Sequence, residues 1–183
     1  IRFYSLSRLK SGHLGILVKR HGHGVCSNRL HELSEGDKIS ATIHRNPHFR
    51  APLNRPLAFV ANGSGMGPFV GMIQDLEDGA GAVLFWGIQT KAQYVLVSRE
   101  LESALARGAL KSVHTAFSRE STGPHHVQDA VDSWDELLDF VHDNGTWIIC
   151  GSHAMSEGLT EVIAQRTSKN RDDLITSGCW IED

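Results

Sequence analysis

The feature that most constrains the fold is a strand-then-helix rhythm that begins at Leu57 and fills most of the remaining chain. Apolar runs suited to strands occupy residues 57–61, 82–87, 111–117 and 147–151. The segments between and after them have helical periodicity: one after Pro68, then 94–107, 127–144 and 156–167. Strands that alternate with helices in this way predict a parallel α/β sheet.

The first third of the chain has a different pattern. Apolar and polar residues alternate over 2–7 and 13–19, a further strand is predicted at 38–44, and a short helix after Ser27. A proline-rich stretch follows and ends in the linker 51–56. The sequence therefore predicts a β-rich unit at 1–50 and an α/β unit at 57–183.

Composition limits the classes of protein that this chain can represent. The 183 residues carry a net charge of −3 and 40% hydrophobic residues, without an apolar run near the length of a membrane span. We expect no nucleic-acid partner and no membrane contact from this segment. Three widely spaced cysteines argue against a disulfide framework and for the cytoplasm, or the cytoplasmic face of a membrane protein. The start, "IRFYSLS", has no initiator Met or signal pattern and suggests the interior of a longer product.

The turn "NGSGMGP" follows the first strand of the α/β unit. Gly63, Gly65 and Gly67 allow backbone amides to approach an anion, and Pro68 suits the first turn of the next helix. The spacing is not the dinucleotide G-x-G-x-x-G and lacks the Lys of a P-loop. Phosphate binding is the favoured interpretation, and a merely tight strand-to-helix turn is the alternative.

Eight motifs in order resemble those of the ferredoxin–NADP reductase superfamily: "RFYS", "GVCSNRL", "NGSGMGPF", "LFWG", "AFSRE", "HVQ", "IICGS" and "GCWIED". The last motif and "AFSRE" look most like the diflavin reductases, such as NADPH–cytochrome reductase and the sulfite reductase flavoprotein, whereas "LVKR", "GVCSN" and "CG-x-x-x-M" look more like the plant-type enzymes of the superfamily. The resemblance implies a partial antiparallel β-barrel that binds FAD at 1–50, truncated at its N-terminus, followed by an NADP-binding α/β domain at 57–183.

On the flavin side, the resemblance implies that Arg2 pairs with the FAD pyrophosphate and that Tyr4 stacks on the isoalloxazine. Ser5 would face the flavin N5. Taken alone, "RFYS" also fits an edge strand and "GVCSNRL" an ordinary capped helix. The remaining flavin contacts implied are Phe3, Leu17, Lys19, Gly24, Val25, Cys26 and Ser27.

On the nucleotide side, the resemblance places Gly87 beside the nicotinamide ribose or pyrophosphate, and Ser118 and Arg119 at the 2′-phosphate of NADP. The family's K-x-Y-x-Q is replaced by "HHVQ" after Pro124, so His126 would stack on adenine and the missing Lys weakens a strict preference for NADPH. The implied nucleotide set also includes Ser64, Met66, Pro68, Gln128, Cys150, Gly151 and Met155.

The resemblance also implies the chemistry. Cys150 would lie against the nicotinamide C4 and Asp183 would stabilise its transient charge, together with Ser5. The implied function is an oxidoreductase module that passes hydride from NADPH to FAD and electrons to a redox acceptor protein or a fused electron-transfer domain. The alternative is a non-catalytic nucleotide-binding or sensor domain of the same fold. A metal site among the eleven histidines is disfavoured, because no Cys or carboxylate falls at ligand spacing.

Overall fold

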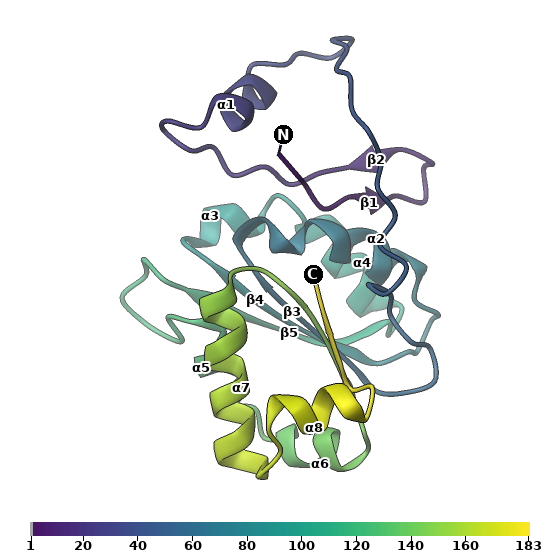
Figure 1. Cartoon of the computed structure of the whole chain (residues 1–183), viewed down its shortest axis with the longest axis vertical. Helices are drawn as coiled ribbons and strands as arrows, with labels where there is room; N and C mark the ends of the chain where they lie inside the picture. Colours follow the sequence, from purple (N-terminus) through teal and green to yellow (C-terminus); the bar gives the residue numbers. More distant parts are fainter. Residues whose placement is uncertain (1) are drawn as a thin grey trace.

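A computed structural model describes residues 2–183, and its main feature is a five-stranded sheet in the order β5-β4-β3-β6-β7 (Figure 1). All four strand pairs are parallel. The strands are β3 (Leu57–Asn62), β4 (Ala82–Ile88), β5 (Leu110–Phe117), β6 (Thr146–Cys150) and β7 (Trp180–Glu182). The sheet confirms the parallel α/β unit predicted from the rhythm of the sequence.

Alternate side chains of the central strands enter two separate hydrophobic cores. Phe59 and Ala61 of β3 pack into one core with Trp86, whereas Ala58 and Val60 enter the other. Burial on both faces is typical of parallel sheets and explains the continuous apolar runs in these strands.

The helices cover the two faces of the sheet. The first core is closed by helices α2 and α4, and the second by α5, α6, α7 and α8. Their bounds are α2 (Gly67–Asp75), α3 (Lys91–Tyr94), α4 (Ser98–Ala106), α5 (Val127–Asp132), α6 (Leu137–His142), α7 (His153–Thr167) and α8 (Arg171–Thr176). In Figure 1 the N-terminal segment lies on the side of α2, and the C-terminus points toward it.

Two long predicted helices are each divided. Helix 94–107 becomes α3 and α4, because Val97 adopts a φ of −134° that no helix uses. Helix 127–144 becomes α5 and α6, because the Ser133 hydroxyl donates to the carbonyls of Asp129 and Ala130 and ends the first piece. Helix α8 and strand β7 were not predicted.

The predicted β-rich first third is largely wrong. Within residues 2–50 the only strands are β1 (Ser7–Arg8) and β2 (Leu14–Gly15), which form one short antiparallel pair, and residues 38–44 contain no strand. A strand needs a partner for its backbone groups, and within residues 2–183 none lies beside 38–44, where Ile39 and Ile43 are exposed. Helix α1 (Val25–His31) begins before Ser27, not after it.

Buried Ser7 joins the N-terminal segment to the sheet unit. Its hydroxyl donates to the carbonyl of Gly67 and accepts from the N–H of Gly71 at 3.1 Å, so it bridges one turn of α2. Gly71 allows this approach, since a Cβ there would lie 2.7 Å from the carbonyl oxygen of Arg8. The contact seats β1 directly on the backbone of α2 (Figure 1).

Replacing Ser7 tests this contact. Ser7→Ala should lower the free energy of unfolding by about 1–3 kcal/mol, because two buried backbone groups lose their side-chain partner. Denaturant unfolding measures the change, with Ser40→Ala at an exposed position as control. Equal stability of the two variants would contradict the role given to Ser7.

Candidate functional site: a basic cleft and a nucleotide crevice

The site begins where the sheet changes direction. The chain runs from β3 to β4 and β5 and then returns to the other side of β3 with β6, so the carboxyl ends of β3 and β6 frame a crevice. Ala61 and Cys150 pair at these ends. Crevices at such points are the usual ligand sites of open parallel sheets.

The glycine-rich turn occupies this crevice, and its three glycines differ in structural role. Gly63 adopts a positive φ of 53° with open space around it, which starts the 3₁₀ turn Gly63–Met66. A Cβ on Gly65 would collide with the carbonyl oxygen of Cys150, so only glycine lets the turn lie on the end of β6. Gly67 is buried at the start of α2, and Pro68 follows in the first turn as predicted. Anion binding by this turn remains a prediction.

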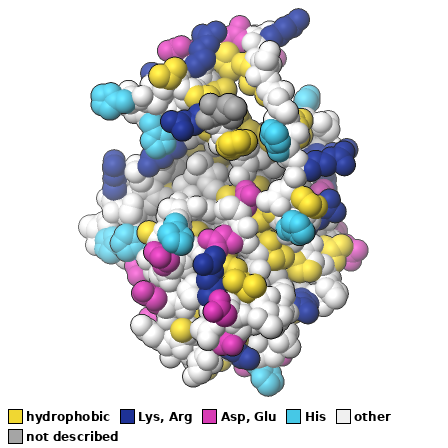
Figure 2. Space-filling model, in the orientation of Figure 1, with side chains coloured by type: hydrophobic (Ala, Val, Ile, Leu, Met, Phe, Trp, Pro, Cys, Tyr) yellow, Lys and Arg dark blue, Asp and Glu magenta, His cyan; other side chains and the backbone are white. Residues whose placement is uncertain are grey.

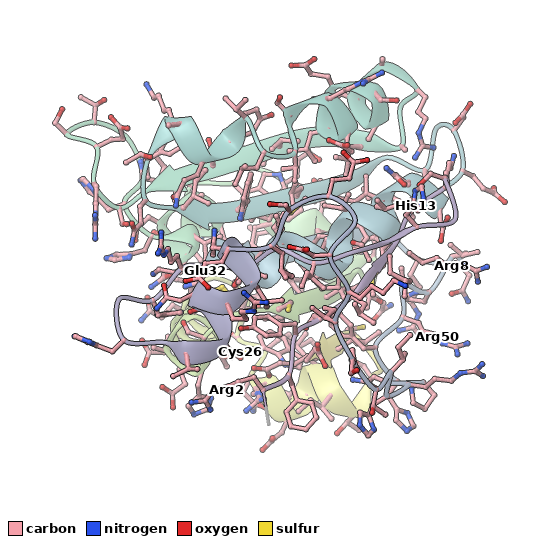
Figure 3. The ribbon with its side chains drawn as sticks, turned by 90° about the horizontal axis from the view of Figure 1, so that it is seen from above. Arg2, Arg8, His13, Cys26, Glu32 and Arg50 are labelled. Atoms are coloured by element: carbon pink, nitrogen blue, oxygen red, sulfur yellow. The ribbon has the colours of Figure 1, made fainter. Side chains whose placement is uncertain are left out.

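A large cleft of roughly 2300 Å³ lies between the N-terminal segment and the sheet unit. Most predicted flavin residues line it, together with Ser64 and Pro68: Arg2, Phe3, Tyr4, Ser5, Lys19, Gly24, Val25, Cys26 and Ser27. Its charged lining is basic except for Asp183: Arg2, Lys19, Arg29 and Arg45. Figure 3 shows Arg2 and Cys26 at one end of the N-terminal segment, away from Arg8, His13 and Arg50.

The two segments of the chain also differ in net charge. Residues 1–56 contain ten Lys and Arg against three Asp and Glu, a net charge of +7, and residues 57–183 contain eight against eighteen, a net charge of −10. Figure 2 shows many basic side chains and histidines around the N-terminal segment, with most visible acidic side chains on the sheet unit. The cleft therefore lies on the positive side of the molecule, which suits an anionic ligand.

Tyr4 and Cys26 meet within this cleft. A hydrogen bond with Cys26, followed by burial, raises the pKa of the Tyr4 phenol above its ordinary value. A protonated phenol keeps both its O–H donor and an uncharged ring face. Such a ring face can stack on a planar ligand.

The three predicted catalytic residues come together although they are far apart in the chain. The Ser5 hydroxyl donates to Asp183 Oδ2 at 2.9 Å. The pKa of Cys150 is raised to about 11, chiefly by burial and then by the negative charge of Asp183, while a hydrogen bond with Ser5 lowers it. Cys150 is therefore a neutral thiol at physiological pH. The arrangement provides one fixed carboxylate, one hydroxyl and one uncharged sulfur at the end of β6.

A polar network holds the strand that carries Asp183. Glu182 accepts from Arg171 at 2.5 Å and from the indole N–H of Trp180 at 3.1 Å. Burial alone would raise the pKa of Glu182, but hydrogen bonds from Ser156, Trp180 and Arg171 and the charge of Arg171 lower it overall. The backbone N–H of Asp183 donates to the carbonyl of Ile149 at 3.1 Å. The end of the chain is thus held by β6 through its backbone and by α8 through the side chain of Glu182.

A smaller pocket of about 390 Å³ lies beside the crevice. The predicted nucleotide residues that line it are Gly63, Gly87, Ser118, His126, Gln128 and Met155, and Lys19 reaches it as well. The lining also includes His125, next to His126, and four polar residues that sequence analysis did not single out: Asn62, Gln89, Gln93 and Ser152. Of these four, Asn62 belongs to the turn "NGSGMGP" and Ser152 is the N-cap residue of α7, whereas Gln89 and Gln93 carry no sequence signal.

The residues predicted for the 2′-phosphate and adenine are all exposed. The backbone N–H of Ser118 donates to the carbonyl of Ile88, which sets the side chain at the pocket, whereas exposed Arg119 lies outside its lining. The N–H of His126 donates to the carboxylate of Asp129 at 2.8 Å, which fixes the start of α5. His126 is thus the exposed N-cap residue of α5.

Several predicted contacts lie outside the lining of both cavities. Leu17 packs against the first core and Met66 is fully buried in it. Cys150 also belongs to this core, with 6% of its surface exposed. The other members of this group are Gly65, Gly67, Arg119 and Gly151. Gly151 touches Met155, since a Cβ there would lie 2.9 Å from its Cε. Except for exposed Arg119, these residues have a packing role in the structure, and for all of them ligand contact stays a prediction.

The fold and the crevice are those of an open parallel α/β domain with a ligand site at the carboxyl ends of its strands. The sequence profile of the family described as oxidoreductase NAD-binding domain matches residues 59–161, more than half of the chain. The chain therefore belongs to this family. The resemblance to reductase modules of the diflavin type is confirmed by the relatives below.

Among known proteins, the chain is 31% identical to NADPH oxidoreductase A of Dictyostelium discoideum, over 80% of the chain and 24% of that protein. It is 25% identical to the NADPH–cytochrome P450 reductase of the same organism, over 90% of the chain and 28% of the relative. The sulfite reductase [NADPH] flavoprotein alpha-component of Vibrio cholerae is 28% identical over 81% of the chain and 26% of its own length. The chain spans about a quarter of the length of these relatives.

Two further features of residues 2–183 bear on the site. Their helices include none that combines the length and the apolar character needed to cross a lipid bilayer. In the same residues, no three His, Cys, Asp or Glu side chains gather in a way that could hold a metal ion.

The opposite effects of Ser5 and Asp183 on Cys150 can be measured by alkylation. In a background with Cys26→Ser and Cys179→Ser, the pH midpoint for alkylation of Cys150 should fall in Asp183→Asn, because a negative charge that disfavours the thiolate is removed. It should rise in Ser5→Ala, because the hydrogen bond with Ser5 that lowers the pKa of the thiol is lost. Asp172→Asn, at an exposed position of α8, is the control. Shifts in the same direction for both variants would refute the arrangement.

Proposed function

We propose that the chain is the reductase module of an FAD-dependent oxidoreductase, in which NADPH delivers hydride to FAD and electrons pass on to a redox acceptor. The observation that carries the proposal is the meeting of Ser5, Cys150 and Asp183, with the hydrogen bond of 2.9 Å between Ser5 and Asp183. These residues come from both units and meet where the basic cleft and the sheet crevice adjoin. A hydride donor and acceptor must face each other at such a junction.

The residues of the cleft fit FAD. A dinucleotide carries a pyrophosphate and a planar ring, and the cleft offers a guanidinium from Arg2 and an uncharged phenol from Tyr4. Its volume of roughly 2300 Å³ is ample for a ligand of this size. When bound, FAD supplies the two-electron acceptor chemistry that no side chain can provide. We further propose that residues 1–50 form part of the flavin-binding barrel, that 51–56 is a linker and that 57–183 is the NADP-binding domain.

The side chains of the chain would then act by position and charge. The carboxylate of Asp183 stabilises positive charge that develops on the nicotinamide ring, and its two oxygens are oriented before the reaction begins. The neutral thiol of Cys150 offers van der Waals contact without competing for protons. The hydroxyl of Ser5 links the two sides. No protein nucleophile is required.

The smaller pocket would hold the nucleotide. Ser118, His125 and His126 line it without an acidic side chain among the lining residues of the described chain, which suits a 2′-phosphate. Exposed Arg119 follows Ser118 and can reach toward the same group. Support for NADPH also comes from the names of the relatives, which include an NADPH oxidoreductase and an NADPH–cytochrome P450 reductase.

The acceptor is a redox protein or a fused electron-transfer domain. The chain covers 14% of a nitric oxide synthase of Bombyx mori with 32% identity, so relatives of this module occur within much longer chains. We place the module in the cytoplasm or at the cytoplasmic face of a membrane protein. This placement rests on the reduced cysteines that the sequence favours.

Flavin reduction tests the function. The full-length protein should bind FAD, and NADPH should bleach its visible spectrum. Cys150→Ala and Asp183→Asn should slow this reduction in stopped flow by about tenfold to a hundredfold at little cost in NADPH affinity, as for interactions made mainly in the transition state. A protein that binds nucleotide but holds no flavin would instead identify a non-catalytic sensor domain.

Nucleotide choice tests Arg119. One charged contact of about 1.5–3 kcal/mol corresponds to about tenfold to a hundredfold, so Arg119→Ala should lower kcat/KM for NADPH by that factor and leave NADH nearly unchanged. Arg99→Ala, on the exposed side of α4, is the matched control. Equal losses with both nucleotides would give Arg119 a structural role and reopen the assignment of the cofactor.

A further inference from the structure

Asn46 reaches from the N-terminal unit to the last residue of the sheet unit. Its Nδ2 donates to Asp183 Oδ1 at 2.9 Å, while the Ser5 hydroxyl donates to Oδ2 at 2.9 Å. The two oxygens of one carboxylate therefore accept hydrogen bonds from two different parts of the N-terminal unit. Asn46 also lines the basic cleft, next to Arg45.

We propose that Asn46 is a positioning residue for hydride transfer, because it fixes the plane of the Asp183 carboxylate that Ser5 holds by only one oxygen. The inference rests on the proposed function and extends it to a residue that no motif of the sequence indicates. A carboxylate held at one oxygen can still rotate about its side-chain bonds, whereas one held at both oxygens keeps one orientation.

The amide of Asn46 is itself oriented. The backbone N–H of His48 donates to Asn46 Oδ1 at 3.2 Å, so the carbonyl end of the amide is engaged and the NH₂ end faces Asp183. The backbone N–H of Asp183 donates to the carbonyl of Ile149. Asp183 is thus held at its backbone by β6 and at its side chain by Ser5 and Asn46.

The position of the Asp183 carboxylate can be followed through its effect on the ionisation of the Cys150 thiol. The charge of Asp183 is one cause of the raised pKa of the Cys150 thiol. If Asn46 no longer holds Oδ1, the carboxylate can turn away from the thiol toward solvent, which is the more favourable place for a charge. The thiol then becomes easier to ionise. This effect needs no bound flavin or nucleotide and gives a readout that is independent of activity.

The first experiment measures alkylation of Cys150 as a function of pH. The background carries Cys26→Ser and Cys179→Ser, and the variant tested is Asn46→Ala. We expect the pH midpoint to fall in Asn46→Ala and to remain unchanged in His48→Ala, whose side chain is not the group that orients the amide. In an Asp183→Asn background, Asn46→Ala should have no further effect. An unchanged midpoint in Asn46→Ala, or the same shift without the Asp183 carboxylate, would overturn the inference.

The second experiment measures flavin reduction in the full-length, FAD-loaded protein. Asn46→Ala should slow reduction by NADPH about tenfold, the size expected for one hydrogen bond to a charged group, with unchanged FAD content and NADPH affinity. Asn46→Asp should be slower still, since it places a second negative charge beside Asp183, and Asn46→Gln, which keeps the amide, should recover part of the rate. A tenfold loss that persists in the Asp183→Asn background would refute the role of Asn46. Failure of NADPH to reduce the wild-type flavin would refute the proposed function, and the alkylation result would still decide whether Asn46 orients the Asp183 carboxylate.

Discussion

The rest of the structure depends on the close contact between the glycine-rich turn and the end of β6. Gly65 lies against the carbonyl group of Cys150, and a side chain at that position would force the two apart. This contact sets the depth of the crevice and the place of the Cys150 thiol beside it. The start of α2 follows from the same turn, and through Ser7 the helix in turn seats the N-terminal unit. The absence of a Cβ at Gly65 therefore positions both the crevice at the end of β6 and the N-terminal unit.

The sheet unit could be predicted from the sequence because its signals are local. Each of β3, β4, β5 and β6 is an apolar run flanked by turn residues, and each was placed within a residue or two. The N-terminal unit could not be predicted in this way. Alternation at 38–44 indicates which residues would suit a strand, but a strand forms only beside a partner, and in residues 2–183 that partner is absent. Strand β7 was missed because three residues carry little periodic signal.

The residues of the candidate site likewise divide into those that could be predicted from the sequence and those that could not. Resemblance predicted Ser5, Cys150 and Asp183, and the structure brings them together across 178 positions of sequence. Their neighbours Ser7 and Asn46 carry no motif, because each acts through a partner that is distant in the sequence. The glycines illustrate the remaining gap. Sequence spacing suggested a common role in anion binding, whereas only the packed structure separates the glycine needed for a positive φ from the one needed for contact with β6.

The opposite net charges of the two segments have a consequence for how firmly the molecule is held together. Residues 1–56 carry +7 and residues 57–183 carry −10, so a long-range attraction supplements the short-range contacts at β1 and α2. Charges on the surface are screened over about 8 Å at physiological ionic strength, whereas the buried bridge of Ser7 is insensitive to salt. Ionic strength therefore changes the electrostatic attraction between the two segments, whereas the contact at Ser7 keeps their relative position. The cleft lies between the two segments and is subject to this change in attraction.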